Sequence, residues 1–530
     1  VLLVRNKKEF RALGSRCPHY GALLSKGNPG AGLGEKLCQG AQLSPPERGG
    51  FSIAGALKGE RLRCPWHGAC FNIKTGDIEE YPSLDCLPCF KVTVEDGKVF
   101  VTAKKKVLAL PDVTKHEQHL AASKRCHLNC ATVLLLGGGV AALVCAETLR
   151  QEGFTGRIIM ATKEKHGPYD KSKLSKEMHL KPEDIYLRKP EFLDACDIEL
   201  WTEKEAVWVD FQKQKVHFKD GSSQKYNQLL IAVGSHSNFL QVPGADLQNV
   251  CVLNTPEDSS KILELATGKN LVLIGASFVG TWLDKSRHHA PAGDTNETSL
   301  QPSSAACLGF GWARLECSNQ LPLLSQMLQN KGVKFYMKTE LRELKGKAGK
   351  VTEAVLASGE KLPADVVVLG IGVFPNSAFL NGTSIARDDH GAILVDLHMQ
   401  TNIPNVFAAG DVVSFPVALL NGDRSSIHHQ QVAEAHGRIA ALNMLKRGEE
   451  LHTVPFFWTT MLGKTIRYAG CGKGYTDTVV KGSLEQQKFL IFYIRDGIVT
   501  AAASLDCDPM LSLIAEVLYL GKQISKEEAE

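Results

Sequence analysis

Two short cysteine–histidine segments constrain the fold of this 530-residue chain more than any other feature. The sequence CPH holds Cys17 and His19, and the sequence CPWHG holds Cys64 and His67. Proline and glycine favour tight loops in both segments, because proline fixes φ and glycine reaches positive φ. Two loops that each present one thiolate and one imidazole predict a shared metal centre, so the chain has to fold these loops against each other.

The ligand types in the loops indicate which metal centre they hold. Two thiolates suit one iron of a [2Fe–2S] cluster and two neutral imidazoles suit the other, which is the ligand set of a Rieske centre. The alternative, a single zinc ion, usually joins a Cys-x₂₋₄-Cys half to a His-x₃₋₅-His half. Both halves are mixed in this chain, so we predict a Rieske cluster with the ligands Cys17, His19, Cys64 and His67.

The stretch between the two loops is unusual for a small domain. Residues from about 28 to 56 are rich in glycine, proline and serine and show no hydrophobic period. A long surface-loop insertion costs little stability, because closure entropy grows only logarithmically with loop length. Two explanations stay open, an insertion that the cluster domain tolerates or retained non-coding sequence in the gene product.

The composition bounds the class of protein. A chain of 530 residues predicts three or four domains. A net charge of +4 over this length indicates neither nucleic acid nor an anionic membrane as a partner. No run of about 18 apolar residues occurs, so no transmembrane helix is expected. The 15 cysteines are odd in number and irregularly spaced, which favours a reducing compartment over a disulfide framework.

A first glycine-rich turn follows a buried strand predicted for residues 132–136. The turn reads G-x-G-x-x-A with Gly137, Gly139 and Ala142, and a small-residue helix and a second strand complete a βαβ unit. Gly137 permits the sharp turn, Gly139 lets a pyrophosphate approach the backbone, and Ala142 lets helix and strand pack closely. The helix N-terminus then faces the anion. We predict a dinucleotide site here, with Glu164 binding the ribose.

Further motifs resemble those of flavoprotein reductases related to glutathione and ferredoxin reductases. They are PYD at 168–170, LSK at 174–176, LLIAVG at 229–234 and AAGD at 408–411. The resemblance implies that Asp411 binds a ribityl hydroxyl of FAD, that His429 lies near the isoalloxazine ring, and that Lys176 is the catalytic residue that stabilises reduced flavin by its charge. A helix N-cap stays open for Asp411, and a capping or core histidine for His429.

A second glycine-rich turn is predicted after a strand at 271–274, with Gly275 and Gly280 binding the nicotinamide nucleotide. The unit should continue with a helix and with a strand that ends in the acidic residue selecting NADH. Instead, residues 281–324 are atypical and mostly polar, and no strand pattern closes the unit. The acid that selects NADH cannot be placed in this stretch, so the sequence does not distinguish NADH from NADPH. A splice or gene-prediction artefact is one explanation for the stretch.

Together these features resemble the Rieske-containing, apoptosis-inducing-factor-like flavoproteins. The predicted fold is multi-domain, with a small all-β Rieske [2Fe–2S] domain, an α/β flavoprotein reductase with two dinucleotide-binding domains, and an α+β C-terminal domain. The expected boundaries are 1–106 for the Rieske domain, 107–130 for a linker, 131–250 and 376–450 for the two parts of the FAD-binding domain, 251–375 for the NAD(P)-binding domain and 451–530 for the C-terminal reductase domain.

The resemblance also implies a function. It implies an oxidoreductase that passes electrons from NAD(P)H through FAD to the Rieske cluster and on to an unknown acceptor. It further implies a mitochondrial association, with the cytoplasm as the alternative location, and a link to apoptosis. Any targeting segment is expected outside the sequence given. An alternative function stays open, in which the nicotinamide site is defective and the flavoprotein acts as an interaction or cell-death factor.

Overall fold

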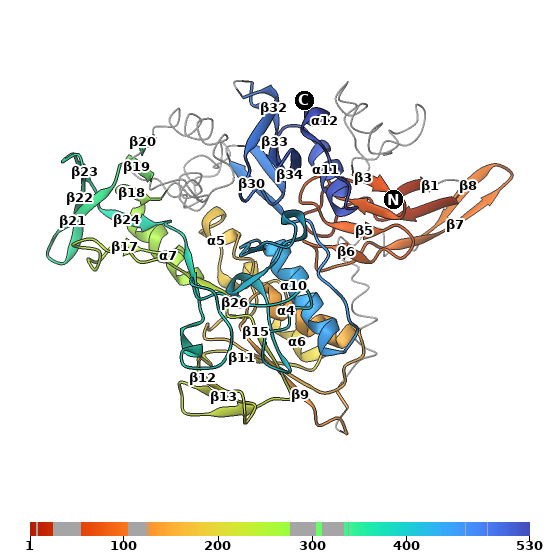
Figure 1. Cartoon of the computed structure of the whole chain (residues 1–530), viewed down its shortest axis with the longest axis horizontal. Coiled ribbons are helices and arrows are strands. Elements are labelled where there is room, and N and C mark those ends of the chain that lie inside the picture. Colours follow the sequence, from red (N-terminus) through yellow and green to blue (C-terminus); the bar gives the residue numbers. More distant parts are fainter. Residues whose placement is uncertain are drawn as a thin grey trace.

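A computed structural model of the chain describes residues 1–6, 9–24, 55–103, 125–126, 128–275, 304–309, 333–337, 339–461, 463–484 and 486–530. The described residues form four lobes (Figure 1). An N-terminal lobe of two small sheets lies beside a C-terminal lobe, and a nicotinamide lobe lies on the opposite side of the C-terminal lobe. A flavin lobe lies below all three in this view. The two cluster loops belong to the N-terminal lobe.

The N-terminal lobe consists of two four-stranded antiparallel sheets, in the orders β1-β2-β7-β8 and β3-β4-β5-β6. Their bounds are β1 (Leu2–Asn6), β2 (Glu9–Leu13), β3 (Ala56–Lys58), β4 (Arg61–Arg63), β5 (Cys70–Asn72), β6 (Ile78–Glu80), β7 (Cys89–Glu95) and β8 (Lys98–Thr102). The first cluster loop follows β2, and the second joins β4 to β5. Of the insertion predicted at 28–56, the described part is the start of β3, and residues 28–54 lie outside the described residues.

The flavin lobe is built on a parallel five-stranded sheet in the order β11-β10-β9-β15-β27. Its strands are β9 (Thr132–Leu136), β10 (Arg157–Ala161), β11 (Ile198–Trp201), β15 (Gln228–Ile231) and β27 (Val406–Ala408). Both faces of β9 are buried, as the continuous apolar run TVLLL predicts. Helices α4 (Val140–Gln151) and α10 (Gln430–Met444) pack closely at Gly437 of α10. A Cβ at this position would lie only 2.2 Å from the Ala141 carbonyl oxygen of α4, so the close approach requires glycine.

The nicotinamide lobe corrects one prediction from the sequence. Its parallel sheet has the order β17-β24-β18-β19-β20, with β17 (Val250–Cys251), β18 (Asn270–Ile274), β19 (Ser304–Gly309), β20 (Val333–Met337) and β24 (Val366–Leu369). The expectation that no strand closes the second βαβ unit was wrong, because β19 pairs in parallel with both β18 and β20. The strand reads SAACLG, whose small residues have weak β propensity, so backbone pairing on both sides outweighs local preference.

The C-terminal lobe is a five-stranded antiparallel sheet in the order β30-β31-β34-β33-β32, with helices α11 (Met510–Tyr519) and α12 (Lys526–Ala529). Its strands are β30 (Phe456–Met461), β31 (Lys464–Gly470), β32 (Asp477–Ser483), β33 (Lys488–Arg495) and β34 (Ile498–Leu505). Helix α11 contacts β31 and β34 of its own lobe and also β3 of the N-terminal lobe. The helix therefore lies at the junction of the two lobes.

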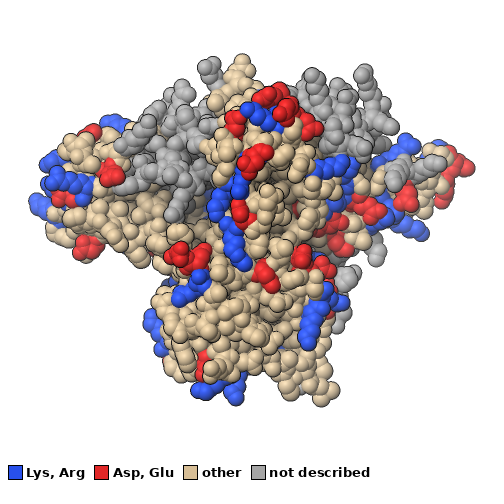
Figure 2. All heavy atoms as spheres, in the orientation of Figure 1, with Lys and Arg blue, Asp and Glu red and all other residues tan. Residues whose placement is uncertain are grey.

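Smaller elements complete the described structure. The strands are β12 (Ala206–Asp210), β13 (Lys215–Phe218), β14 (Ser223–Lys225), β16 (Ser235–Ser237), β21 (Leu341–Lys347), β22 (Lys350–Leu356), β23 (Lys361–Pro363), β25 (Val373–Pro375), β26 (Ile393–Leu394), β28 (Val413–Pro416) and β29 (Arg424–Ser425). The helices are α5 (Lys173–Lys176), α6 (Pro190–Ala195) and α7 (Pro256–Ala266), with 3₁₀ turns at Pro182–Ile185, Ala378–Leu380, Gly410–Val412 and Ala418–Leu420. None of the described helices has the length and apolar character needed to cross a bilayer. Figure 2 shows acidic and basic side chains interspersed on one face of the molecule.

Candidate cluster and flavin sites

The two cluster loops share one backbone geometry. In each loop the cysteine N–H donates to the carbonyl of the residue five positions later, at 2.8 Å from Cys17 and 2.7 Å from Cys64. The glycine four positions after the cysteine donates back to the cysteine carbonyl, at 2.9 Å from Gly21 and 3.2 Å from Gly68. Both glycines have positive φ, at 72° and 79°, which a residue with a side chain rarely adopts. The backbone conformation of each loop therefore accounts for the glycine at this position of the motif.

The loops bring the predicted ligands together. The Nδ1 atoms of His19 and His67 lie 3.0 Å apart, and the buried thiols of Cys17 and Cys64 are in hydrogen-bonding contact. Among the residues that the structure describes, no three Cys, His, Asp or Glu side chains converge on one metal position. The four residues form a thiol pair and an imidazole pair, which is the grouping of ligands in a Rieske cluster.

Both histidines are neutral near pH 7. Burial lowers the pKa of His19 to about 4 and the pKa of His67 to about 2. Contact with Cys64 and burial raise the pKa of the Cys17 thiol. A metal ligand has to be a neutral imidazole or a thiolate, so the imidazoles are ready to bind and the thiols release their protons when metal binds. The donor set fits a Rieske cluster.

Side chains from two other lobes surround the imidazole pair. The Trp458 ring of β30 stacks on the His67 ring, with centroids 4.2 Å apart and planes 28° apart. The same indole meets His19 edge-on at 5.4 Å. The Tyr20 hydroxyl donates to Asp170 of the flavin lobe at 2.6 Å. The cluster ligands therefore lie where the N-terminal, flavin and C-terminal lobes meet.

Lys176 lies on the cluster side of the flavin lobe. Burial is the largest cause of the lowered pKa of His19 and of His67. The positive charge of Lys176 makes a smaller contribution to the lowering of both pKa values. The residue ends the short helix α5, six positions after Asp170. The structure thus brings the predicted flavin-side lysine and the predicted cluster histidines into one electrostatic environment.

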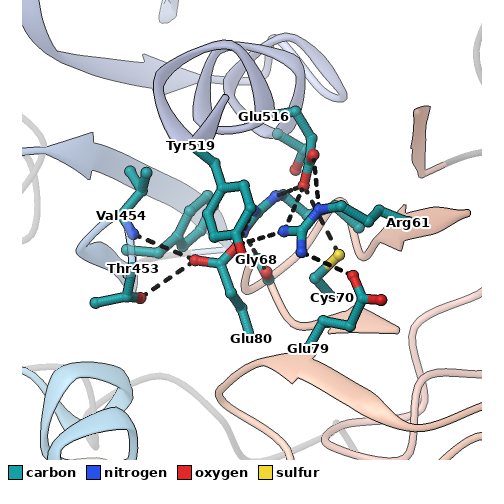
Figure 3. A network of polar contacts seen from close by, with 12 residues as sticks. Arg61, Gly68, Cys70, Glu79, Glu80, Thr453, Val454, Glu516 and Tyr519 are labelled. Carbon is teal, nitrogen blue, oxygen red and sulfur yellow. Dashed lines mark hydrogen bonds and ion pairs between the residues drawn. The ribbon is translucent and has the colours of Figure 1, made fainter. Parts of the chain in front are cut away.

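A buried ion network lies behind the second loop (Figure 3). Arg63 donates through Nε to a Glu516 carboxylate oxygen at 2.7 Å and also pairs with Glu80. Arg61 donates to Glu80 at 2.7 Å and to Glu516 at 3.2 Å, and its guanidinium lies 3.7 Å from the Tyr519 ring centroid. Arg63, Glu80 and Glu516 are almost completely shielded from solvent. Motif analysis singled out none of these residues, although Glu516 is the one charge in the apolar sequence of α11.

The first glycine turn has the geometry of a pyrophosphate site. Gly137 has a φ of 130°, and a Cβ on it would lie 2.1 Å from the Ala232 carbonyl oxygen. Gly139 has no heavy atom within 4 Å of its Cβ position, which leaves its backbone open, and Ala142 is fully buried against the sheet. A cavity of about 240 Å³ adjoins the turn. Its lining includes Gly137, Gly138, Gly139, Thr162, Glu164, Lys171, Lys204, His236 and Asn376.

The other predicted flavin residues lie around the same lobe. Glu164 lines the cavity and accepts a hydrogen bond from the Tyr169 hydroxyl at 2.7 Å. Asp411 is partly exposed and accepts from the Ser235 hydroxyl at 3.1 Å. It lies in a 3₁₀ turn well before α10, so the N-cap explanation for Asp411 does not apply to that helix.

His429 occupies the N-cap position of α10 without a side-chain cap hydrogen bond. Its Nδ1 is shielded from solvent and has no hydrogen-bond partner among the described residues. Burial and the adjacent His428 lower the pKa of His429 to about 4. The imidazole lies 5.0 Å from the Phe457 ring. A buried nitrogen that has no partner among the described residues fits a lobe that binds a polar cofactor such as FAD.

Two buried residues of α10 were not identified from the sequence. His436 accepts a hydrogen bond on Nδ1 from the Gly410 N–H at 3.3 Å, so it holds the turn that carries Asp411. Glu434 accepts from the Gln430 amide at 3.1 Å, and its second carboxylate oxygen has no partner in the described part of the chain. Neither position belongs to a motif, and helical spacing alone does not distinguish them from core residues.

The second glycine turn is described only at its start. Gly275 has a φ of 97°, and a Cβ on it would lie 2.2 Å from the Gly370 carbonyl oxygen. This repeats the relation of Gly137 to Ala232 in the flavin lobe. Gly280 lies outside the described residues, as does nearly all of the stretch 281–324 apart from β19.

Replacing Gly137 with alanine is expected to abolish FAD binding, because the new Cβ would collide with the Ala232 carbonyl oxygen and Gly137 has a positive φ. Flavin absorbance per mole of purified protein measures the loss. Gly153→Ala is the matched control, since Gly153 also has positive φ, at 89°, but has no atom within 4 Å of its Cβ position. Parent-level flavin in Gly137→Ala would contradict a cofactor-binding role for this turn.

Glu434 is expected to make stability depend on pH. Burial raises its pKa to about 8 from a usual value of 4.5, so between these values the folded chain keeps a proton that the unfolded chain releases. Stability therefore falls as pH rises through this window. Glu434→Gln is expected to be more stable than the parent at about pH 8.5 and nearly equal at about pH 4.5, measured by urea unfolding. The exposed Glu450→Gln serves as control, and a pH-independent difference for Glu434→Gln would contradict the assignment.

Comparisons with known proteins agree with this arrangement. Three family profiles match: "Rieske [2Fe-2S] domain" at 1–91, "Pyridine nucleotide-disulphide oxidoreductase" at 131–284 and 318–437, and "Reductase C-terminal" at 456–530. Apoptosis-inducing factor 3 of Mus musculus is 43% identical over 534 residues, which cover 100% of this chain and 82% of the relative, and the Homo sapiens protein gives the same values.

More distant relatives match about three quarters of this chain. The biphenyl dioxygenase system ferredoxin–NAD(+) reductase component of Paraburkholderia xenovorans is 26% identical and covers 75% of this chain and 96% of the relative. The crystal structure of the ferredoxin reductase for the CYP199A2 system of Rhodopseudomonas palustris superposes with a TM-score of 0.69 at 25% identity, over 75% of this chain and 96% of that one.

These findings confirm the predicted fold class and the predicted cofactors, which are FAD, a Rieske [2Fe–2S] cluster and NAD(P)H as substrate. The domain boundaries stay predictions. The chain belongs to the pyridine nucleotide-disulphide oxidoreductase family and, within it, to the Rieske-containing apoptosis-inducing-factor-like flavoproteins, which makes it an FAD-dependent NAD(P)H oxidoreductase.

Proposed function

We propose that this oxidoreductase uses its own Rieske cluster as the first acceptor of electrons from its flavin, and that an external one-electron acceptor then takes electrons from the cluster. The observation that carries this proposal is the position of the imidazole pair, with His67 stacked on Trp458 and Tyr20 bonded to Asp170 of the flavin lobe. A relative named as a ferredoxin–NAD(+) reductase component matches 75% of this chain. In this chain the N-terminal lobe supplies an iron–sulfur acceptor within the same molecule.

The residues have the following proposed roles. FAD held by this lobe would supply the exchange between the two-electron oxidation of NAD(P)H and single-electron transfer to an iron–sulfur acceptor. Gly137, Gly139 and Ala142 form the pyrophosphate turn for FAD, Glu164 binds a ribose, Asp411 binds a ribityl hydroxyl and His429 lies by the ring. Gly275 and Gly280 belong to the NAD(P)H turn. Cys17, His19, Cys64 and His67 hold the iron–sulfur cluster.

Lys176 is proposed as the catalytic residue. The positive charge of its ammonium group lowers the pKa of both cluster histidines, and the same charge would favour a negatively charged reduced flavin. Trp458 of the C-terminal lobe contacts both rings of the histidine pair. No protein nucleophile is needed for this chemistry.

The finding of β19 weakens the case for an idle nicotinamide site, because the second βαβ unit has its next strand. The alternative of a pure interaction factor rested on the apparent lack of that strand. Apoptosis is part of the name of the mouse and human relatives. A role of this chain in cell death, its mitochondrial location and the identity of its acceptor stay predictions of the resemblance.

Anaerobic reduction tests the proposed function. Absorbance and low-temperature EPR of the purified protein are recorded after NADH, after NADPH and finally after dithionite. Flavin bleaching followed by a Rieske signal with either nucleotide supports the proposal. A Rieske signal that appears only with dithionite would overturn internal transfer from NAD(P)H.

A further inference from the structure

The carbonyl groups of the second cluster loop are held by side chains that lie outside the loop. The Ser512 hydroxyl of α11 donates to the Cys64 carbonyl at 3.1 Å. Arg467 of β31 donates through Nε to the Trp66 carbonyl at 2.7 Å. Both donors belong to the C-terminal lobe, and both acceptors lie on the segment that carries two of the cluster ligands.

A third carbonyl of the loop is held indirectly by the same helix. Arg63 donates through Nη1 to the Gly68 carbonyl at 2.9 Å and through Nε to Glu516 at 2.7 Å. Glu516 lies four positions after Ser512, so both side chains point from the same face of α11. Figure 3 shows Glu516 and Gly68 within the same network of polar contacts. Alternate carbonyls of the loop, at positions 64, 66 and 68, thus all have partners that depend on the C-terminal lobe.

Shape complementarity supports the same contact. A Cβ on Gly68 would lie 2.6 Å from the Phe456 ring of β30, so the loop backbone rests directly on that ring. The first loop is held differently. Its Gly21 carbonyl accepts from Arg16 of the same segment at 2.9 Å. It contacts other lobes through the Tyr20 hydroxyl, which donates to Asp170, and through the His19 ring, which meets Trp458 edge-on.

We infer that Ser512 and Arg467 are positioning residues for the Rieske cluster, through which the C-terminal reductase lobe fixes the orientation of the ligands Cys64 and His67. This inference rests on the proposed function in one respect, namely that these loops hold the cluster. Groups that bind the backbone of metal ligands orient the ligands and tune the metal. The electronic properties of the cluster are therefore set partly by the reductase, and the N-terminal lobe is not a self-contained electron carrier.

The test uses the full-length holoprotein reduced with dithionite, without nicotinamide nucleotide. Ser512→Ala is expected to shift the EPR g values and the midpoint potential of the cluster, and Ser512→Thr, which keeps the hydroxyl, to restore the parent values. Arg467→Lys, which keeps a positive charge toward Asp508 but lacks the Nε donor, is expected to shift the signal as well. The matched control is Ser504→Ala, because Ser504 is fully buried in the same lobe and its hydroxyl has no partner among the described residues.

The outcomes separate this inference from the proposed function. Parent g values and parent potential in both Ser512→Ala and Arg467→Lys would overturn the positioning role, even if NAD(P)H reduces the cluster normally. Shifts in these variants support the positioning role even if NAD(P)H fails to reduce the cluster, a failure that would overturn the proposed function alone. Equal shifts in Ser504→Ala and Ser512→Ala would show a general packing effect and would also overturn the inference.

Discussion

Replacing Glu516 with alanine is expected to destabilise the junction of the N-terminal and C-terminal lobes by about 3–5 kcal/mol, because it leaves buried guanidinium groups without their counter-charge. The Glu516 carboxylate is fully buried and pairs with Arg63 at 2.7 Å and with Arg61 at 3.2 Å. Urea unfolding followed by tryptophan fluorescence measures the change in free energy, since Trp66 and Trp458 lie at the junction.

Glu79 provides the matched control for Glu516. Its carboxylate pairs with Arg61 at 2.7 Å, but a quarter of the side chain remains exposed. Because solvent-exposed ion pairs contribute about 0–1 kcal/mol, Glu79→Ala is expected to cost less than about 1 kcal/mol. Equal destabilisation by the two substitutions would contradict the view that burial of the network decides its contribution.

Replacing Cys64 with serine is expected to remove the iron–sulfur cluster almost completely, because a Rieske centre needs both thiolates. Iron content and the dithionite-reduced EPR signal measure the loss. Flavin bleaching by NAD(P)H is expected to continue, since the flavin lobe has its own core and its own turn motif. Transfer to a one-electron acceptor is expected to fall with the cluster signal.

Cys70→Ser is the matched control for the ligand substitution. Cys70 is as fully buried as Cys64 and lies at the end of the same loop, with its sulfur 3.7 Å from a Glu516 oxygen. The sequence pattern does not make it a ligand, so Cys70→Ser is expected to retain the cluster. A cluster signal that survives in Cys64→Ser but disappears in Cys70→Ser would show that the ligand assignment is wrong.

The parts of the site whose geometry depends on residues close together in the chain could be predicted from the sequence. The cysteine–histidine loops and the first glycine turn each depend on residues within about a dozen positions, so their geometry follows from short motifs. The strand β19 could not be predicted in this way, because SAACLG has little strand propensity. These residues form a strand because they pair with β18 on one side and β20 on the other. The same applies to Glu434 and His436, whose burial depends on how α10 packs.

The contacts of the second loop were also beyond local prediction. Ser512 lies 448 positions from Cys64, and Glu516 lies 453 positions from Arg63, so no periodicity connects them. One signal was available in principle. A single glutamate inside the apolar run MLSLIAEVLY indicates either a buried partner or an exposed helix face. Only the assembled lobes distinguish these alternatives.

The docking of α11 on the second loop has a consequence for biosynthesis. At about 5–20 residues per second, the ribosome delivers Ser512 roughly 20–90 s after Cys64. During that interval the N-terminal sheets can pair, but the loop with Cys64 and His67 lacks its carbonyl partners. The order of synthesis thus leaves the ligand loop without these partners until helix α11 has been made and has docked on it.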